Sequence, residues 1–114
     1  MTFRDCSNYI QDMVKAMDDI QRFVLDMNFE QFMQDDKTSS AVIRKLEIIG
    51  EAAKQVSANI REGNPAIPWK EMAGMRDRLI HFYSGVDYRL VWETINQRIP
   101  EVKLSLQKYL RHKF

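Results

Sequence analysis

The residues of this chain that could do chemistry lie close together in one stretch, RDRLIHFY, which spans residues 76–83. Arg76 carries a planar guanidinium, whose donors fit phosphate oxygens and stabilise negative charge that develops on them. A histidine such as His81 can take a proton from one oxygen and give it to another near neutral pH. RNA supplies its own nucleophile, the 2′-hydroxyl, so these two side chains together would suit cleavage of RNA without a bound metal.

On a regular helix, the spacing of Arg76 and His81 would keep the two side chains from acting on the same phosphate. Successive helical residues turn by about 100°, so Arg76 and His81 would point about 140° away from each other. Asp77 and His81 would share a face, and a helix C-terminus favours a histidine, so a purely structural pairing is also open. Tyr83 is equally open, because it can contact a base or phosphate of RNA or lie at the edge of the core.

Two arrangements would bring Arg76 and His81 onto one substrate. The helix can end or bend at Ser84–Gly85, which would let His81 lean over the last turn. Alternatively, a twofold axis can place this stretch against its copy, so that groups from both chains line one cleft. The second arrangement would also use apolar surface left over in a chain with seven methionines and twelve aromatic residues.

The elements that must position this stretch are predicted to be helices, because apolar residues recur at steps of three and four. The stripes predict one helix over about residues 4–27 and a second through Val56 with an N-cap at Thr38, Ser39 or Ser40. FEQFMQDD, at residues 29–36, is expected to form a short helical turn between them.

Helical patterning continues in the second half of the chain. A third helix is expected from Trp69 to Tyr83, after a long loop in NIREGNPAIPW. Asp87 is placed to cap the next helix, which Pro100 should kink or restart. No period-two strand of useful length appears, so the sequence predicts an all-α, antiparallel bundle of four to five helices.

Length and composition limit the classes of protein that this chain can be. A chain of 114 residues with 45% hydrophobic and 29% charged residues fits one globular domain, residues 1–114. No apolar run approaches the roughly 20 residues of a membrane span, and the first residues lack a signal-peptide pattern, so we expect a cytoplasmic protein without a membrane partner. Cys6 stands alone, which rules out an internal disulfide and makes a thiolate metal cluster very improbable.

The charge of the chain is distributed unevenly. Residues 1–75 hold nine lysines and arginines against twelve acids, whereas residues 76–114 hold eight against four. Anion binding is therefore expected near RDRLIHFY and near the tail LRHKF, although a solvated basic helix face would give the same pattern.

Several segments in this order resemble the HepT-like toxins of the HEPN superfamily. They are the R-x4-H-x-Y pattern of Arg76, His81 and Tyr83, the preceding Trp69 and Met75, the VDYRLVW segment after it, and the Gly-Glu-Ala step in KLEIIGEAAKQV. The resemblance covers about residues 5–108. R-x4-H alone is a weak signal, and the specificity lies in the ordered set of segments.

The resemblance implies a homodimer with a HEPN-like helical fold, in which the motifs of two chains meet in a cleft and act as a metal-independent endoribonuclease on an RNA substrate. Arg76 would polarise the phosphate, His81 would be the general acid or base, and no cofactor would be needed. Family members are usually encoded beside a minimal nucleotidyltransferase antitoxin, which in some systems attaches AMP to the motif tyrosine, here Tyr83. Arg78 is not part of the family pattern, and as an extra cation it would hold RNA or simply be solvated.

Other functions remain open on sequence grounds. A non-catalytic helical subunit that partners a nucleotidyltransferase is one alternative, because no second type of catalytic residue lies near the motif. A structural bundle with an incidental histidine is another. A metalloenzyme is the least favoured class, since His81 and His112 are the only histidines and neither has a second imidazole four residues away.

Overall fold

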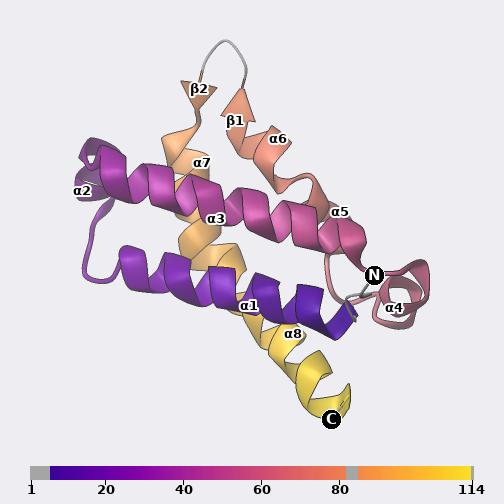
Figure 1. Cartoon of the computed structure of the whole chain (residues 1–114). Helices are drawn as coiled ribbons and strands as arrows, with labels where there is room; N and C mark the ends of the chain where they lie inside the picture. The colour runs from indigo at the N-terminus through magenta and orange to yellow at the C-terminus, as the bar shows by residue number, and fades with distance from the viewer. Residues whose placement is uncertain (1–5, 82–84, 114) are drawn as a thin grey trace, which may run out of the picture.

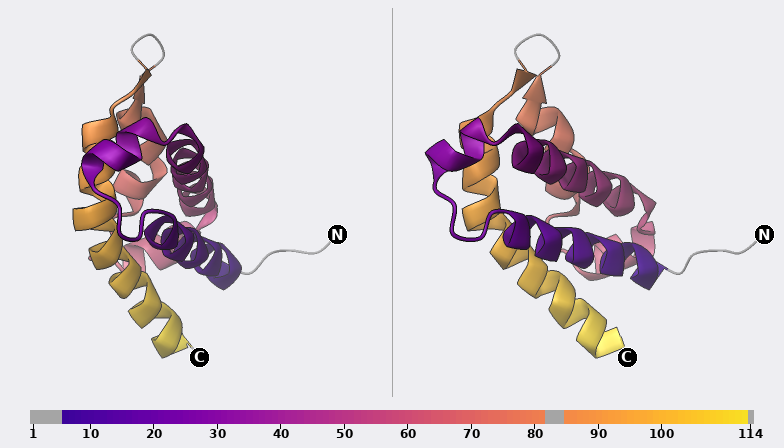
Figure 2. Two further views of the ribbon diagram at one scale, coloured as in Figure 1. Left: turned by 90° about the vertical axis from the view of Figure 1, so that its left-hand side faces the viewer. Right: turned by 60° about the vertical axis from the view of Figure 1, so that its left-hand side comes forward.

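Three long helical rods form the frame of the protein. The computed structural model describes residues 6–81 and 85–113, and Figure 1 shows α1 (Cys6–Phe23) and α3 (Asp36–Gln55) running side by side. A third rod consists of α7 (Tyr88–Glu93), the π-helical segment η1 (Thr94–Arg98) and α8 (Ile99–Lys113). It passes behind the other two in Figure 1 and runs obliquely to α1 in both views of Figure 2. The prediction of an all-α bundle is confirmed.

Short helices connect the rods. α2 (Phe29–Gln34) starts with a capping box, in which Asn28 and Gln31 each accept a hydrogen bond from the other's backbone. α4 (Ala58–Gly63) occupies part of the segment that was expected to be a loop, and α5 (Trp69–Ala73) follows it. α3 begins before the predicted caps, because Asp35 accepts hydrogen bonds from the backbone and the hydroxyl of Thr38.

Pro100 lies inside the continuous helical course of the third rod, at the position where the sequence predicted a kink or a restart. It lies in the first turn of α8, where its missing N–H leaves no hydrogen bond unmade. η1 directly precedes α8, and its π-helical hydrogen bonds join residues five apart instead of four. The helix is therefore wider just before the proline ring. The rod therefore passes the proline without a break in its helical course.

The third predicted helix differs most from the structure. It is divided at Gly74 into α5 and α6 (Met75–Leu79), and it ends four residues before Tyr83. The chain then forms β1 (Ile80–His81), which pairs antiparallel with β2 (Gly85–Val86), and these two strands of two residues each are too short to give a periodic pattern in the sequence. Gly85 has a φ of +79°, which glycine adopts without strain, and it enters β2 from the turn.

Hydrogen bonds then close the base of this hairpin. The backbone N–H of Asp87 donates to the carbonyl of Leu79 across 2.9 Å, directly below the Ile80–Val86 pair. The Asp87 carboxylate accepts from the backbone of Leu90 at 3.0 Å, so the predicted cap of α7 is confirmed. The hairpin is thus held between two helix ends.

The predicted apolar stripes meet in one core. α1 packs against α3 and α8, and the buried side chains include most of those that the periodicity indicated. They include Ile10, Met13, Met17, Ile20, Val42, Leu46, Ile49, Ala53, Val91, Ile95, Ile99, Val102 and Leu106. A buried Leu, Ile or Met contributes about 1.5–3 kcal/mol, so these stripes carry much of the folding energy. No helix in the described ranges has the length and apolar content to span a bilayer.

Gly50 explains part of the Gly-Glu-Ala step on α3. A β-carbon at this position would lie 3.4 Å from the carbonyl oxygen of Met72 and 3.5 Å from that of Ala73. The backbone of α3 therefore approaches the end of α5 closely, and a side chain larger than a methyl group would separate them. This approach seats α5 and the following α6 on α3.

A buried carboxylate links α1 to α3. Only 3% of the Asp19 side chain is exposed, and it accepts hydrogen bonds from Lys15 at 2.8 and 3.0 Å and from Arg22 at 3.1 Å. Lys45 of α3 lies 3.0 Å from the same carboxylate. The hydrogen bond from Lys15, and then that from Lys45, lowers the pKa of Asp19 to about 2.

Asp19→Asn should therefore destabilise the fold by on the order of 2–3 kcal/mol, since three cations lose a buried charged acceptor. The folded pKa lies below that of the unfolded chain, so the contribution of Asp19 is complete above about pH 4 and is lost as the pH falls towards 2. Urea unfolding at pH 7 and pH 3 measures both effects. Asp18→Asn is the matched control, because the neighbouring Asp18 is half-exposed and should matter by less than about 1 kcal/mol. Equal losses in the two variants would refute this role for Asp19.

Candidate active site at the end of α6

The predicted site residues lie at one end of the molecule, where α6 leads into the β1–β2 hairpin (top of Figure 1). Arg76 and Arg78 are both on α6, and their side chains are 54% and 60% exposed. His81 is in β1, opposite Gly85. The side chain of His81 and the whole of Tyr83 lie outside the described residues, so their predicted roles stay predictions.

The end of α6 changes the geometry that sequence spacing suggested. Ile80 has extended dihedral angles, φ −125° and ψ 119°, so the helical rotation stops between Arg76 and His81. The angle of about 140° that a continuous helix would impose does not apply. For the same reason Asp77 and His81 do not lie on one face of a continuous helix. The bend occurs at Leu79–Ile80, earlier than the Ser84–Gly85 position that the sequence suggested.

Arg76 is held only loosely by carboxylates. Its Nε lies 3.9 Å from Oε1 of Glu47 on α3, and its Nη1 lies 3.6 Å from Oδ1 of Asp77. Both distances exceed those of a hydrogen bond, and contacts of this kind between exposed groups contribute little energy. The two carboxylates therefore keep the guanidinium at the end of α6 and leave its donors available to a phosphate.

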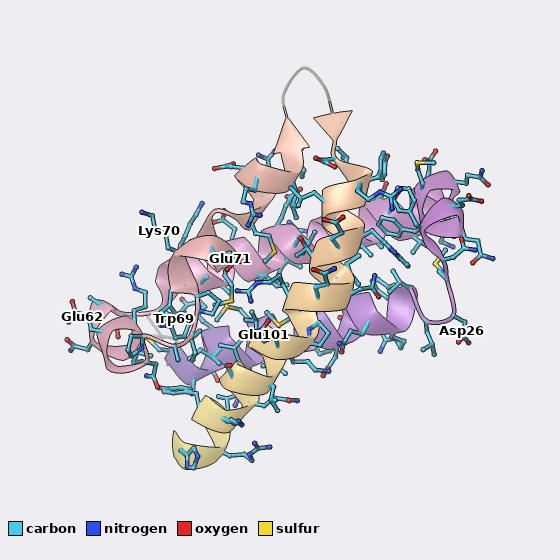
Figure 3. The ribbon with its side chains drawn as sticks, turned by 180° about the vertical axis from the view of Figure 1, so that it is seen from behind. Asp26, Glu62, Trp69, Lys70, Glu71 and Glu101 are labelled. Carbon is cyan, nitrogen blue, oxygen red and sulfur yellow. The ribbon has the colours of Figure 1, made fainter. Side chains whose placement is uncertain are left out.

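Arg98 of η1 shows the contrasting case of a tightly held arginine. Its Nε and Nη2 donate to the two carboxylate oxygens of Glu71 at 2.9 and 2.7 Å, and its Nη1 donates to Glu101 at 2.8 Å. Figure 3 shows Glu71 of α5 beside the rod that carries Glu101. The hydrogen bonds from Arg98 lower the pKa of Glu71, and Glu71 in turn raises the pKa of Arg98.

Arg78 lies at the edge of this network. Its Nη1 is 3.8 Å from Glu71, a carboxylate that Arg98 already occupies with two hydrogen bonds. Arg78 is therefore an exposed cation that holds its carboxylate less closely than Arg98 does. Sequence reasoning missed Glu47 and Glu71, because nothing in their local patterns distinguishes them from solvated acids on a helix. Only the packing of α3 and α5 around α6 brings them to the arginines.

The described residues contain no group of three or more His, Cys, Asp or Glu side chains that could hold a metal ion. The chemistry visible in the described part of the site is thus that of two accessible guanidinium groups at a helix end, next to the strand that carries His81.

Comparisons with known proteins show the family to which this chain belongs. Residues 13–109 match the family described as Ribonuclease HepT-like, and the chain therefore belongs to that family. It is 49% identical to a Methanocaldococcus jannaschii protein named as a candidate RNase, MJ0125, over 97% of this chain and 96% of that protein. It is 46% identical to a Thermococcus cleftensis protein named as a probable ribonuclease HepT, over 92% of this chain and 96% of the relative. No solved structure matches the chain significantly.

The Glu71–Arg98 pair should matter for stability more than other ion pairs of the surface. Glu71→Gln removes the charged acceptor of two short hydrogen bonds between α5 and η1, so we expect a loss of about 1.5–3 kcal/mol in chemical unfolding. Glu51→Gln is the control, because exposed Glu51 meets Lys54 only at 3.5 Å and should change stability by less than about 1 kcal/mol. A Glu71→Gln variant as stable as this control would show that the pair contributes nothing.

Proposed function

We propose that this protein is the toxin of a toxin–antitoxin pair and acts as a metal-independent endoribonuclease. The observation that carries the proposal is the end of α6 at Leu79, which frees His81 from the far side of a continuous helix, while the Arg76 side chain on α6 is 54% exposed. Membership of the HepT-like ribonuclease family supports RNA as the substrate.

The reaction needs only groups of this chain and of RNA. His81 accepts the proton of a 2′-hydroxyl, the 2′-oxygen forms a bond to the adjacent phosphorus, and the bond to the 5′-oxygen breaks. The leaving 5′-oxygen takes a proton from an imidazole, which gives a 2′,3′-cyclic phosphate and a 5′-hydroxyl. Arg76 binds the phosphate and stabilises the charge that develops on its oxygens. Arg78 adds a second cation for the flanking backbone.

The active species is a homodimer in this proposal. One chain offers a single Arg76 and a single His81, whereas a twofold arrangement of the α6–hairpin ends supplies two of each to one cleft. One imidazole can then act as base while that of the second copy acts as acid. The hairpin stands at the top of Figure 1, beyond α3, so a second copy can meet it without disturbing the packing of α1 and α3.

A minimal nucleotidyltransferase is the antitoxin in this proposal, and it silences the toxin by attaching AMP to Tyr83. The tyrosine stands two residues after His81 in the sequence, between β1 and β2. A phosphate-bearing group at this position would compete with the substrate for Arg76 and would repel the RNA backbone.

Cleavage in EDTA tests the ribonuclease. The purified protein should cut RNA and leave 2′,3′-cyclic phosphate ends, which mass spectrometry of the fragments identifies. His81→Ala should lower the rate at least about 100-fold, and Arg76→Ala should do so to a similar extent, while circular dichroism shows an unchanged fold. Arg111→Ala removes an exposed arginine from α8 and is the control.

Several outcomes would overturn the assignment. Cleavage that disappears with the chelator would show that a metal is required. Cleavage that persists in His81→Ala would remove the histidine from the mechanism. A protein that binds a nucleotidyltransferase stably, cuts no RNA and keeps its function as His81→Ala would instead be a non-catalytic partner subunit.

Modification of Tyr83 is tested separately. Incubation with the cognate nucleotidyltransferase and ATP should add AMP to Tyr83, located by tandem mass spectrometry, and should abolish RNA cleavage. Tyr83→Phe should remain active and resist silencing by this route, whereas Tyr88→Phe, a change just outside the motif, should still be silenced. Modification at any other residue, or silencing of Tyr83→Phe by AMP transfer, would contradict the proposal.

A further inference from the structure

A second basic region lies far from the hairpin, beside the C-terminal half of α8. A hollow of about 520 Å³ opens there, between the loop after α4 and one face of α8. We call it the α8 hollow, and it is lined by Gly63, Asn64, Pro65, Ala66, Ile67, Ser105, Lys108, Tyr109 and His112. The hairpin and the end of α8 lie at opposite ends of the molecule in Figure 1.

One face of α8 supplies the polar side chains of the α8 hollow. Ser105, Lys108, Tyr109 and His112 follow one another at helical steps of three, one and three, so they lie on the same side of the helix. Lys108 and His112 are exposed and one turn apart, and Tyr109 is partly buried against the core between them. The face thus combines two nitrogen donors with an aromatic ring.

The charge of the α8 hollow distinguishes it from the other hollows described here. None of its lining residues is acidic. The larger hollow of about 740 Å³ beside α5 pairs Arg61 and Lys70 with Glu62 and Glu71, so its cations are offset by carboxylates. The α8 hollow thus offers cationic donors to an anion without a competing carboxylate in its wall, and it lies where the sequence places the basic tail LRHKF.

The wall opposite α8 is held in place by hydrogen bonds. Asn64 donates from its side chain to the carbonyl of Ile60 at 2.9 Å, and its own carbonyl accepts from the indole of Trp69 at 3.0 Å and from the backbone of Ile67 at 3.1 Å. Pro65 stiffens the same loop. A site with a preformed wall loses less entropy when it binds a ligand than a flexible surface does.

We propose that the α8 hollow is a second RNA-binding subsite, which holds a nucleotide of the substrate remote from the cleaved bond. The proposal rests on the ribonuclease function proposed above. Lys108 supplies the charge for a phosphate, and the imidazole of His112 can donate an N–H in either of its protonation states. Tyr109 and Pro65 provide ring surface for the base or ribose of the same nucleotide.

The size of the molecule sets the length of RNA that can use both sites on one chain. The longest dimension of the fold is 40 Å. At a rise of about 3.4 Å per nucleotide, a helical strand needs roughly a dozen nucleotides to span it. The subsite therefore selects long RNA over short fragments.

The experiment measures RNA binding without cleavage, so that it does not depend on catalysis. A His81→Ala background carries either the pair Lys108→Gln and His112→Gln or the matched control Arg111→Gln, which removes an exposed cation of α8 outside the hollow. Fluorescence anisotropy gives the Kd of a labelled 20-nucleotide RNA over a range of salt concentrations. We expect the pair to raise the Kd about fivefold and to lower the slope of log K against log salt by about one. The Kd of the Arg111→Gln control should stay within about twofold of the Kd of the His81→Ala protein.

Three outcomes would overturn the subsite. An unchanged Kd in the double variant would show that RNA does not occupy the α8 hollow, and equal losses in the control would show only diffuse attraction to a basic helix. Failure of the His81→Ala protein to bind RNA at all would also reject it. If the wild type does not cleave RNA but the double variant weakens RNA binding as expected, the ribonuclease function is refuted. The RNA-binding subsite is then still supported.

Discussion

The packing of three amphipathic rods onto one core is the constraint on which the rest of this fold depends. α1 buries its apolar face against α3 and against α8 of the third rod, and α3 also packs on α5 and α6. Such burial requires the rods to approach closely, and two local features permit it. Gly50 removes a side chain where α3 meets α5, and the π-helical turn before Pro100 lets the third rod continue past a residue that disfavours a helix interior.

This frame determines where α6 can lie and where it must stop. α6 packs on α3 and has only five residues before the chain has to return to the start of α7. The hydrogen bond between Leu79 and Asp87 closes that return, and Gly85 supplies the backbone conformation that it needs. The position of the candidate active site is thus a consequence of core packing, and the Arg76 side chain is half-exposed there because it meets Glu47 and Asp77 only at 3.9 and 3.6 Å.

The basic residues are of two kinds: some are held in ion pairs that connect elements of the fold, and others remain available to bind an anion. Lys45 and Arg98 are drawn to Asp19 and Glu71, whose pKa values their hydrogen bonds lower, and they serve to connect elements. Arg76 meets its carboxylates only at 3.6 and 3.9 Å, and Lys108 lines a hollow without an acid in its wall. The basic residues of the C-terminal third therefore lie in two separate regions that can bind an anion, at opposite ends of the fold.

The sequence by itself determined the helices that are long and strongly periodic, because a buried stripe imposes a spacing that can be read directly. It also determined the cap at Asp87 and, through an ordered set of motifs, the family. It could not determine that α6 ends at Leu79, because the apolar pattern of the sequence continues up to Tyr83. The pairing of Ile80 with Val86, which replaces further helix at this point, forms only in the folded chain. Nor could it identify Glu47, Glu71 or the α8 hollow. Their significance comes from contacts between segments distant in sequence, and such contacts exist only once the core has brought those segments together.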